Sequence, residues 1–317
     1  MPTDGRIPIV LAIDVEPDNR DDPPGSGVDA TGFRRTVEWL AALRPRLEDA
    51  TGGAVHFAWY ARMDPQVTEQ GGRPDALVAG APDAVESIVA AADVIGLHTH
   101  AGRWDAARAV WVVDHADPAW IDHCVTSSAE AYRLRFGQPC REHRFGDRFT
   151  SPGILDRLAE QGVRVDLTPE PGQRGRRRPW GVRHATGVVP DYVREPRAAH
   201  RAGDRPLWIP PLSSADPAPA YPVVRRWLRR LRYVGQPRHR TLLIDRGWPS
   251  PDLFWDLAEA QVDAGAAHLA FVIRSDLILR PGWTGASAVL EAGVGRSITR
   301  RLAFVGGEEA LARSIAP

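Results

Sequence analysis

The sequence predicts one α/β domain, a distorted (β/α) barrel of seven or eight units that spans residues 1–317. Short apolar runs alternate with amphipathic helical segments through most of the chain, and this alternation is typical of a parallel sheet with covered faces. Seven or eight units over about 280 residues favour a closed barrel. An open doubly wound sheet is the second choice, because no glycine-rich dinucleotide fingerprint follows the first apolar run.

Eight short runs are the predicted strands, and nearly all of them lead into polar or charged residues. The fourth is mostly polar itself and is the weakest of the set. The runs are Ile7–Ile13, Ala54–Tyr60, Val94–Leu97, Arg141–Phe145, Val163–Val165, Leu207–Ile209, Thr241–Ile244 and His268–Ile273. In a parallel barrel, catalytic residues gather where the strands end, so these polar strand ends are where we look for chemistry.

Six segments with apolar residues at three- and four-residue spacing are the predicted helices. Ser151-Pro152 and Ser250-Pro251 each place an N-cap before a proline at the first helical position. Gly162 and Gly265 stand where a C-cap is expected. The predicted helices are Gly32–Glu48, Asp83–Ala91, Pro118–Phe136, Ser151–Gln161, Val223–Tyr233 and Ser250–Ala264.

The stretch Pro169–Ala202 is predicted to be a long loop inserted at the carboxyl end of the barrel. It is rich in arginine, proline and glycine, and it includes Arg174 and the run Arg176-Arg177-Arg178. Two interpretations stay open. The stretch is either a solvated insertion or a lid whose arginines contact an anionic ligand.

The composition excludes several function classes. The formal net charge is zero and the sequence pI is about 7.2, which argues against a nucleic-acid-binding surface spread over the whole domain. Two cysteines in 317 residues do not form a disulfide framework. The first apolar run is short and ends in Asp14, unlike a signal peptide, and no segment approaches the roughly 20 apolar residues of a membrane span. We therefore expect a cytoplasmic protein that has no membrane span and no extended nucleic-acid-binding surface.

Two pairs of polar residues at strand ends carry the candidate chemistry. Asp14 and Glu16 lie two apart after the first run, and His98 and His100 have the same spacing after the third. Residues two apart on a strand point to one face, so the two pairs can converge across the barrel mouth. Carboxylate and imidazole donors suit zinc or another first-row divalent ion. We expect one divalent metal ion, with zinc favoured.

The chain resembles the polysaccharide deacetylases of the NodB-homology group, carbohydrate esterase family four. Five segments are similar to the motifs of that family and occur in the family's order: Leu11–Asp18, Ile95–His100, Arg144–Arg148, Gly162–Thr168 and His268–Ile273. The resemblance implies a distorted barrel, metal-assisted removal of an acetyl group from an amide or ester, and a carbohydrate-like substrate.

The resemblance also implies roles for individual residues. Asp14 matches the catalytic base, and His98 matches the first metal-binding histidine. Either Glu16 or Asp18 stands in for the metal-binding carboxylate, and Glu16 is preferred because it shares the face of Asp14. Arg144 or Arg148 would orient or neutralise the base.

The sequence departs from the family pattern at three places. Val15 separates two acids that are usually adjacent. Gly102 stands where the second histidine is expected, so either His100 substitutes for it or the site has one histidine fewer. The last strand ends in Arg274-Ser275-Asp276 instead of a histidine that protonates the leaving group. Asp276 could be a protonated acid, while Arg274 could bind a carboxylate or phosphate, stabilise an oxyanion, or pair with Asp276.

Other strand-end residues complete the candidate set. Trp59, Arg62 and Trp104 are predicted to contact substrate, since aromatic rings at a barrel mouth can stack on sugars; packing in the core accounts for the tryptophans equally well. Asp166 is predicted to position the arginine of the third motif. Two further functions stay open. One is a metal-independent glycosidase that uses the carboxylates Asp14, Glu16, Asp166 and Asp276. The other is a catalytically silent relative that binds carbohydrate.

Overall fold

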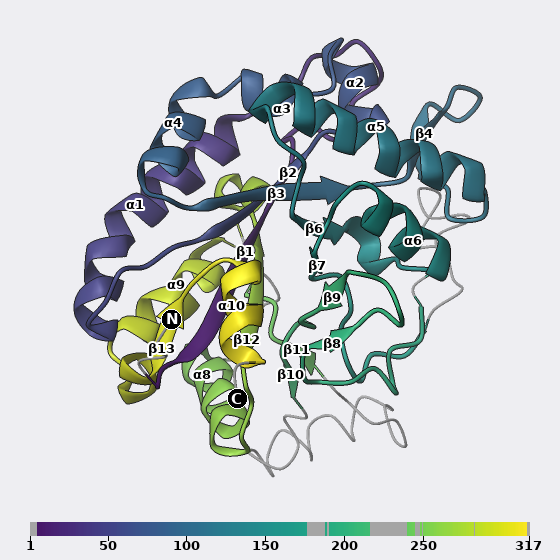
Figure 1. Ribbon diagram of the computed structural model, residues 1–317. Coiled ribbons are helices and arrows are strands. Elements are labelled where there is room, and N and C mark those ends of the chain that lie inside the picture. Colours follow the sequence, from purple (N-terminus) through teal and green to yellow (C-terminus); the bar gives the residue numbers. More distant parts are fainter. Residues whose placement is uncertain are drawn as a thin grey trace, which may run out of the picture.

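The computed structural model describes residues 5–175, 188, 190–215, 240–244, 248, 250–281 and 283–315. A curled, mostly parallel sheet occupies the centre, with helices on its outer face (Figure 1). Its strand order is β12-β1-β2-β3-β6-β7-β9-β8. The strands are β1 (Ile7–Val15), β2 (Ala58–Arg62), β3 (Val94–Thr99), β6 (Glu142–Phe145), β7 (Val165–Asp166), β8 (His200–Arg201), β9 (Trp208–Ile209) and β12 (Leu269–Arg274).

Backbone hydrogen bonds join β12, at one edge of the curled sheet, to the segment that follows β9. Leu212 N donates to Pro169 O beyond β7, at 3.0 Å, and the next residue, Ser213, donates to Ala270 O on β12 at the same distance. Leu243 adds an isolated parallel bridge to Val272. One extended segment thus connects β7 to β12. The predicted α/β fold with a distorted barrel is confirmed. Among the described residues, the curl is closed by isolated backbone hydrogen bonds and one bridge, where a regular barrel has a continuous strand ladder.

The outer face of the sheet is covered by the helices that the apolar spacing predicts. Ser151 Oγ and Ser250 Oγ accept hydrogen bonds from Ile154 N and Leu253 N, as N-caps do. The predicted helices correspond to α1 (Thr31–Thr51), α4 (Pro82–Ala90), α5 (Pro118–Phe136), α6 (Pro152–Glu160) and α8 (Pro251–Asp263). A further helix, α9 (Trp283–Val294), packs against α8 and was not predicted. The predicted helix Val223–Tyr233 lies outside the described residues.

Several elements were not predicted. A hairpin of β4 (Gly102–Asp105) and β5 (Val110–Val113) follows the His98–His100 segment. The short helices α2 (Pro65–Gly71) and α3 (Ala76–Ala79) follow β2, and β10 (Ser214–Ala215) pairs with β11 (Arg240–Thr241). The predicted loop 169–202 contains β8, which pairs antiparallel with β9. Its run Arg176–Arg178 lies outside the described residues.

The last described helix, α10 (Gly307–Ser314), packs inside the curl of the sheet at the amino ends of the strands (Figure 1). It follows β13 (Leu302–Phe304), which pairs with β1. The buried carboxylate of Glu142 accepts hydrogen bonds from Gly307 N at 3.0 Å and Glu308 N at 2.9 Å, so it caps this helix. Tyr60 Oη donates a third bond to Glu142, at 2.9 Å. Burial raises the pKa of Glu142, while the two backbone N–H groups oppose this rise.

We predict that Glu142→Gln destabilises the fold by about 2 kcal/mol, since an amide nitrogen cannot accept and at least one buried donor loses its partner. Tyr60→Phe removes one of the three bonds and serves as the control, with an expected loss of about 1 kcal/mol. Urea unfolding measures both. An unchanged unfolding midpoint in Glu142→Gln would show that the carboxylate does not stabilise α10.

Candidate metal centre and its pocket

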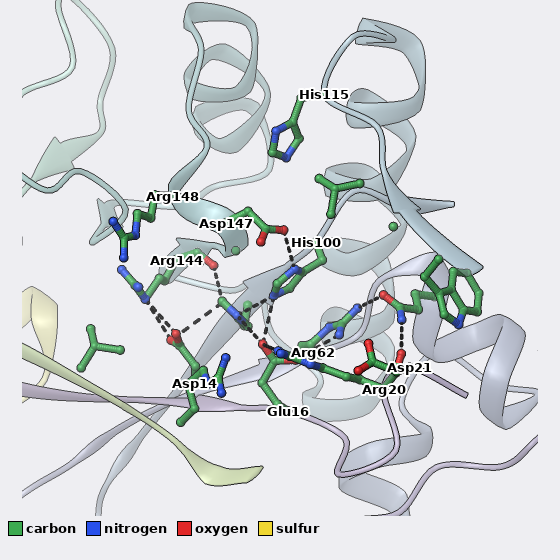
Figure 2. A pocket seen from close by; sticks show the side chains of 18 of the residues that line it. Asp14, Glu16, Arg20, Asp21, Arg62, His100, His115, Arg144, Asp147 and Arg148 are labelled. Carbon is green, nitrogen blue, oxygen red and sulfur yellow. Dashed lines mark hydrogen bonds and ion pairs between the residues drawn. The ribbon is translucent and has the colours of Figure 1, made fainter. Parts of the chain in front are cut away.

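A cavity of about 400 Å³ opens at the carboxyl ends of β1, β3, β6 and β12. Charged side chains from these strand ends and the loops after them line it (Figure 2). They include Asp14 and Glu16 from β1 and the segment that follows it, His98 from β3 with His100 just beyond, and Arg144 from β6. The pocket therefore lies where the polar strand ends of the sequence predict chemistry.

Three predicted ligands converge at the floor of this pocket. His100 Nε2 lies 3.0 Å from His98 Nε2 and 3.1 Å from Glu16 Oε1. His98 Nε2 lies 3.5 Å from the same Glu16 oxygen. Within the described residues, these three side chains form a group whose donor atoms all lie within 4.8 Å of one another.

The other nitrogen of each imidazole is held by a hydrogen-bond acceptor. His98 Nδ1 lies 2.9 Å from Arg144 O, and His100 Nδ1 lies 3.1 Å from Asp147 Oδ2. With a proton on each Nδ1, both rings direct the Nε2 lone pair toward Glu16. A carboxylate or carbonyl behind a histidine is the usual outer partner of a metal ligand.

The turn after β6 sets the position of His100 and its partner. A Cβ atom on Gly146 would lie 2.2 Å from His100 Nε2, so only glycine allows the ring to pack there. Asp147 and Arg148 follow with left-handed φ angles of 53° and 61°. Such backbone costs non-glycine residues about 1–3 kcal/mol each and is commonly found at functional sites. The strained turn directs Asp147 to His100 and Arg148 to the pocket.

The charges around the cluster stabilise positive charge at the point where the donor atoms converge. Burial alone would raise the pKa of Glu16, but His100, Arg20 and Arg62 hold it well below its usual range. Burial and Arg62 would lower the pKa of His100, yet Glu16 and Asp147 raise it to about 9. Arg62 is fixed in turn by Asp64, with Nε–Oδ2 at 2.8 Å and Nη2–Oδ1 at 2.9 Å.

The spacing of the three donor atoms fits a small divalent cation. Ligands about 2.0–2.1 Å from a tetrahedral zinc ion lie roughly 3.3 Å from one another. The observed separations of 3.0, 3.1 and 3.5 Å bracket that value. Two imidazole nitrogens and one carboxylate oxygen also leave a coordination position for water or substrate, as in catalytic zinc sites.

Asp14 lies beside this cluster without joining it. Arg144 Nε donates to both Asp14 oxygens, at 2.9 and 3.1 Å, and Asp14 Oδ1 lies 3.8 Å from His98 Nδ1. Arg144 Nη1 also donates to Leu167 O at 2.9 Å, which fixes the guanidinium. Asp14 is thus held by Arg144 at the edge of the pocket. Arg148 lines the pocket too, and its Nε lies 3.1 Å from Glu170 Oε1.

Asp18, the alternative candidate for the metal-binding carboxylate, binds the start of α1 instead. Its Oδ2 accepts a hydrogen bond from Gly32 N at 2.6 Å, in the first turn of α1. Burial raises the pKa of Asp18 to about 6, although the Gly32 N–H favours its charged form. Gly102, at the place of the family's second histidine, packs so closely on Gln66 that a Cβ would lie 2.6 Å from its Oε1. The structure therefore brings Glu16 and His100, not residues 18 and 102, to the cluster.

The structure places four predicted site residues away from the cavity, and these predictions are corrected. Trp59 points to the outer face of the sheet, where its Nε1 donates to Asp93 at 2.9 Å. Asp166 also faces outward and bonds His143 Nδ1 at 3.0 Å. Trp104 packs edge-on against Trp111, which lines the pocket in its place. Asp276 is buried behind Arg274 and is not among the residues that line the cavity.

Several pocket residues were missed. Glu170 follows β7 closely, and Arg20 and Asp21 lie in the loop after β1. His115, after the unpredicted β4–β5 hairpin, stacks on Phe149 with ring centroids 3.9 Å apart. Its Nδ1 lies 3.1 Å from Val188 O. The sequence offered two signals for these residues. Arg20 lies four residues after Glu16, and Glu170 lies a short distance after the end of a predicted strand.

No family model matches the chain, and no curated protein matches it. None of the helices in the described ranges has both the length and the apolar character that a bilayer crossing requires.

Solved structures with a similar fold were found. One, from Mycobacterium smegmatis, is assigned as a polysaccharide deacetylase; it is 17% identical, with a TM-score of 0.49 over 100% of this chain and 94% of that chain. A 4-alpha-glucanotransferase from Thermococcus litoralis is 11% identical, with a TM-score of 0.49 over 97% of this chain and 40% of that chain. A family 4 acetyl xylan esterase from Clostridium thermocellum, solved with a cobalt ion, is 10% identical. Its TM-score is 0.44 over 98% of this chain and 93% of that chain. TM-scores below 0.5 are too low to assign this chain's fold, which follows from its own sheet.

Proposed function

We propose that the chain is a metal-dependent hydrolase that removes an acetyl or other acyl group from an amide or ester on a carbohydrate-like substrate. The observation that supports this best is the convergence of Glu16, His98 and His100 beside Asp14 at the floor of one pocket. The ordered motifs that resemble the carbohydrate esterase family four deacetylases add to it. Glu16, His98 and His100 would hold one divalent ion, with zinc favoured.

A bound ion would supply Lewis-acid polarisation of the acyl carbonyl and a more acidic water at the same place. Asp14 acts as the general base that takes the proton from the attacking water, since it borders the cluster without contributing to it. Arg144 holds both oxygens of Asp14 and so fixes the direction in which the base accepts the proton.

His115 is our candidate for the group that protonates the leaving nitrogen or oxygen. Among the described pocket residues it is the one imidazole outside the proposed ligand set, and it lies on the side of the pocket beyond His100 and Asp147 (Figure 2). Asp276 is buried outside the cavity, and Arg274 is too strong a base to give up a proton near neutral pH.

We predict that His115→Gln lowers kcat roughly 10²-fold, the lower limit for loss of a general acid, while bound metal and the melting temperature change little. Steady-state kinetics on an acetylated amide, with elemental analysis of the same preparation, measure this. A faster leaving group, such as nitrophenol in an ester, should reduce the defect. An equal defect for good and poor leaving groups would argue against a proton-donor role.

The direct test of the proposed function combines metal removal with a substrate panel. Purified protein is stripped with chelator and reloaded with zinc or cobalt, and acetate release is measured from N-acetylated and O-acetylated sugars. The proposal expects acetate release that is lost on stripping and returns with metal. Full activity of stripped protein on a glycosidic bond would favour the glycosidase. Glycan binding with no turnover under any metal would favour a silent binding protein.

A further inference from the structure

A guanidinium stands at the pocket edge beside the proposed base. Arg274 is the last residue of β12, and the parallel register makes it the direct neighbour of Asp14 on β1. Its side chain lines the pocket and stays 26% exposed, whereas that of Asp14 is 5% exposed. Any substrate group that approaches Asp14 therefore also comes close to a solvent-accessible arginine.

Arg274 shares the buried carboxylate of Asp276 with a second arginine. Arg274 Nε lies 3.3 Å from Asp276 Oδ1, while Arg280 Nη2 lies closer, 2.7 Å from Oδ2. Arg280 is not among the described residues that line the pocket. Arg280, outside the cavity, thus forms the shorter ion pair with Asp276, and Arg274, which faces the cavity, forms the longer one. A looser pair is easier to supplement with an anion from a ligand.

The rest of the pocket is also rich in fixed cationic groups. Among the described residues that line it, five are arginines and five are aspartates or glutamates. Two of those carboxylates have proposed tasks, since Glu16 would bind the metal and Asp14 would take a proton. A divalent ion on Glu16, His98 and His100 would make the formal charge of this lining positive. A pocket of this charge favours an anionic ligand over a neutral one.

We propose that Arg274 binds a carboxylate or phosphate that the substrate carries close to its acyl group. The inference rests on the proposed function and narrows its substrate class to acylated sugar acids or sugar phosphates. A planar guanidinium can donate two parallel hydrogen bonds to either anion. Because Arg274 and Asp14 are paired residues on neighbouring strands, the anionic group must lie on an atom near the acyl-bearing one, so that the two groups reach Arg274 and Asp14 together.

The test measures binding and uses three acetylated sugars. N-acetylglucosamine is neutral, N-acetylglucosamine 1-phosphate carries a phosphate beside the acetamido carbon, and N-acetylmuramic acid carries a carboxylate on the other side. Calorimetric titrations are made with wild type, with and without zinc, and with Arg274→Gln. Arg280→Gln is the matched control, because it removes the other arginine of Asp276 without altering the pocket lining. Arg274→Lys keeps the charge and removes the two-pronged donor.

We expect wild type to bind one of the two anionic sugars about tenfold or more tightly than the neutral one, a typical effect of one charge-assisted contact. Whichever anion binds tighter identifies the source as phosphate or carboxylate. Arg274→Gln should remove the preference, Arg274→Lys should keep part of it, and Arg280→Gln should leave it intact. Equal binding of all three sugars to wild type, or a preference that persists in folded Arg274→Gln, would overturn the inference. Melting temperatures establish that each variant is folded.

Acetate release from the same sugars separates this inference from the proposed function. No turnover of any sugar, with the Arg274-dependent binding preference present, would contradict only the hydrolase. Metal-dependent turnover with equal kcat/KM for neutral and anionic sugars, and equal binding, would contradict only the anionic substrate class.

Discussion

The His98→Ala variant is expected to lose the proposed metal ion and, with it, the proposed acyl-hydrolase activity. His98 supplies one of the three converging donor atoms, and its ring is fixed by Arg144 O. Loss of an outer hydrogen-bond partner alone typically lowers metal affinity 10–100-fold, so loss of the ligand should exceed about 100-fold. Competition with a chromogenic chelator measures the affinity, and elemental analysis gives the metal content of each preparation.

The matched control for this variant is His123→Ala, which removes an exposed histidine on α5. It should bind metal as wild type does, whereas His100→Ala should resemble His98→Ala. Unchanged affinity in folded His98→Ala would place any bound metal elsewhere and remove the main support for the proposed function.

Asp14→Asn should abolish most turnover while the metal remains bound. Loss of a general base typically lowers rates 10²–10⁴-fold, and we expect kcat to fall within that range. Because Asp14 is outside the donor cluster, with Oδ1 3.8 Å from His98 Nδ1, metal affinity should change little. Measuring kcat and metal content on one preparation distinguishes a base from a ligand.

Asp21→Asn tests whether the effect is specific to Asp14. Asp21 lines the same pocket and carries the same charge, but lies in the loop after β1, near Arg20 (Figure 2). We expect Asp21→Asn to change kcat much less than tenfold. Full activity of Asp14→Asn would exclude it as the base. Metal loss in Asp14→Asn would show that this carboxylate supports the metal site directly.

The sequence was sufficient for most of the sheet and for the convergence of Glu16, His98 and His100, because both follow from local patterns. Apolar runs of three to seven residues marked most strands of the curled sheet. Period-two spacing placed Asp14 and Glu16 on the same face of one strand, and His98 and His100 on the same face of another. The pairs end β1 and β3, which lie on either side of β2 in the sheet, and both face the same pocket. The same alternation of side chains along a strand contradicts our prediction that Trp59 contacts substrate. Trp59 and Arg62 are three residues apart on β2, so both could not face the pocket, and it is Arg62 that does.

Other features depend on contacts that no local pattern encodes. Asp147 reaches His100 because two consecutive residues adopt left-handed backbone, and neither is glycine. Asp166 looked like a strand-end acid of the site, yet a two-residue strand turns it outward to His143, whose Nε2 lies 3.2 Å from Thr99 Oγ1. The β4–β5 hairpin and α10 have weak or short patterns and are held by tertiary packing.

Because β1 pairs with β12, the site is expected to form late in folding. Glu16 N donates to Ser275 Oγ across 259 residues of sequence, and Asp14 meets Arg274 over a similar separation. Contacts this distant in sequence form late, since the entropy of a very long loop must be lost first. Helices and local hairpins can form on fast timescales while the base and the proposed anion-binding arginine are still apart. During refolding, the change in intrinsic fluorescence should therefore be complete before ligand binding recovers. Barrel closure and assembly of the site should share the same slow folding step.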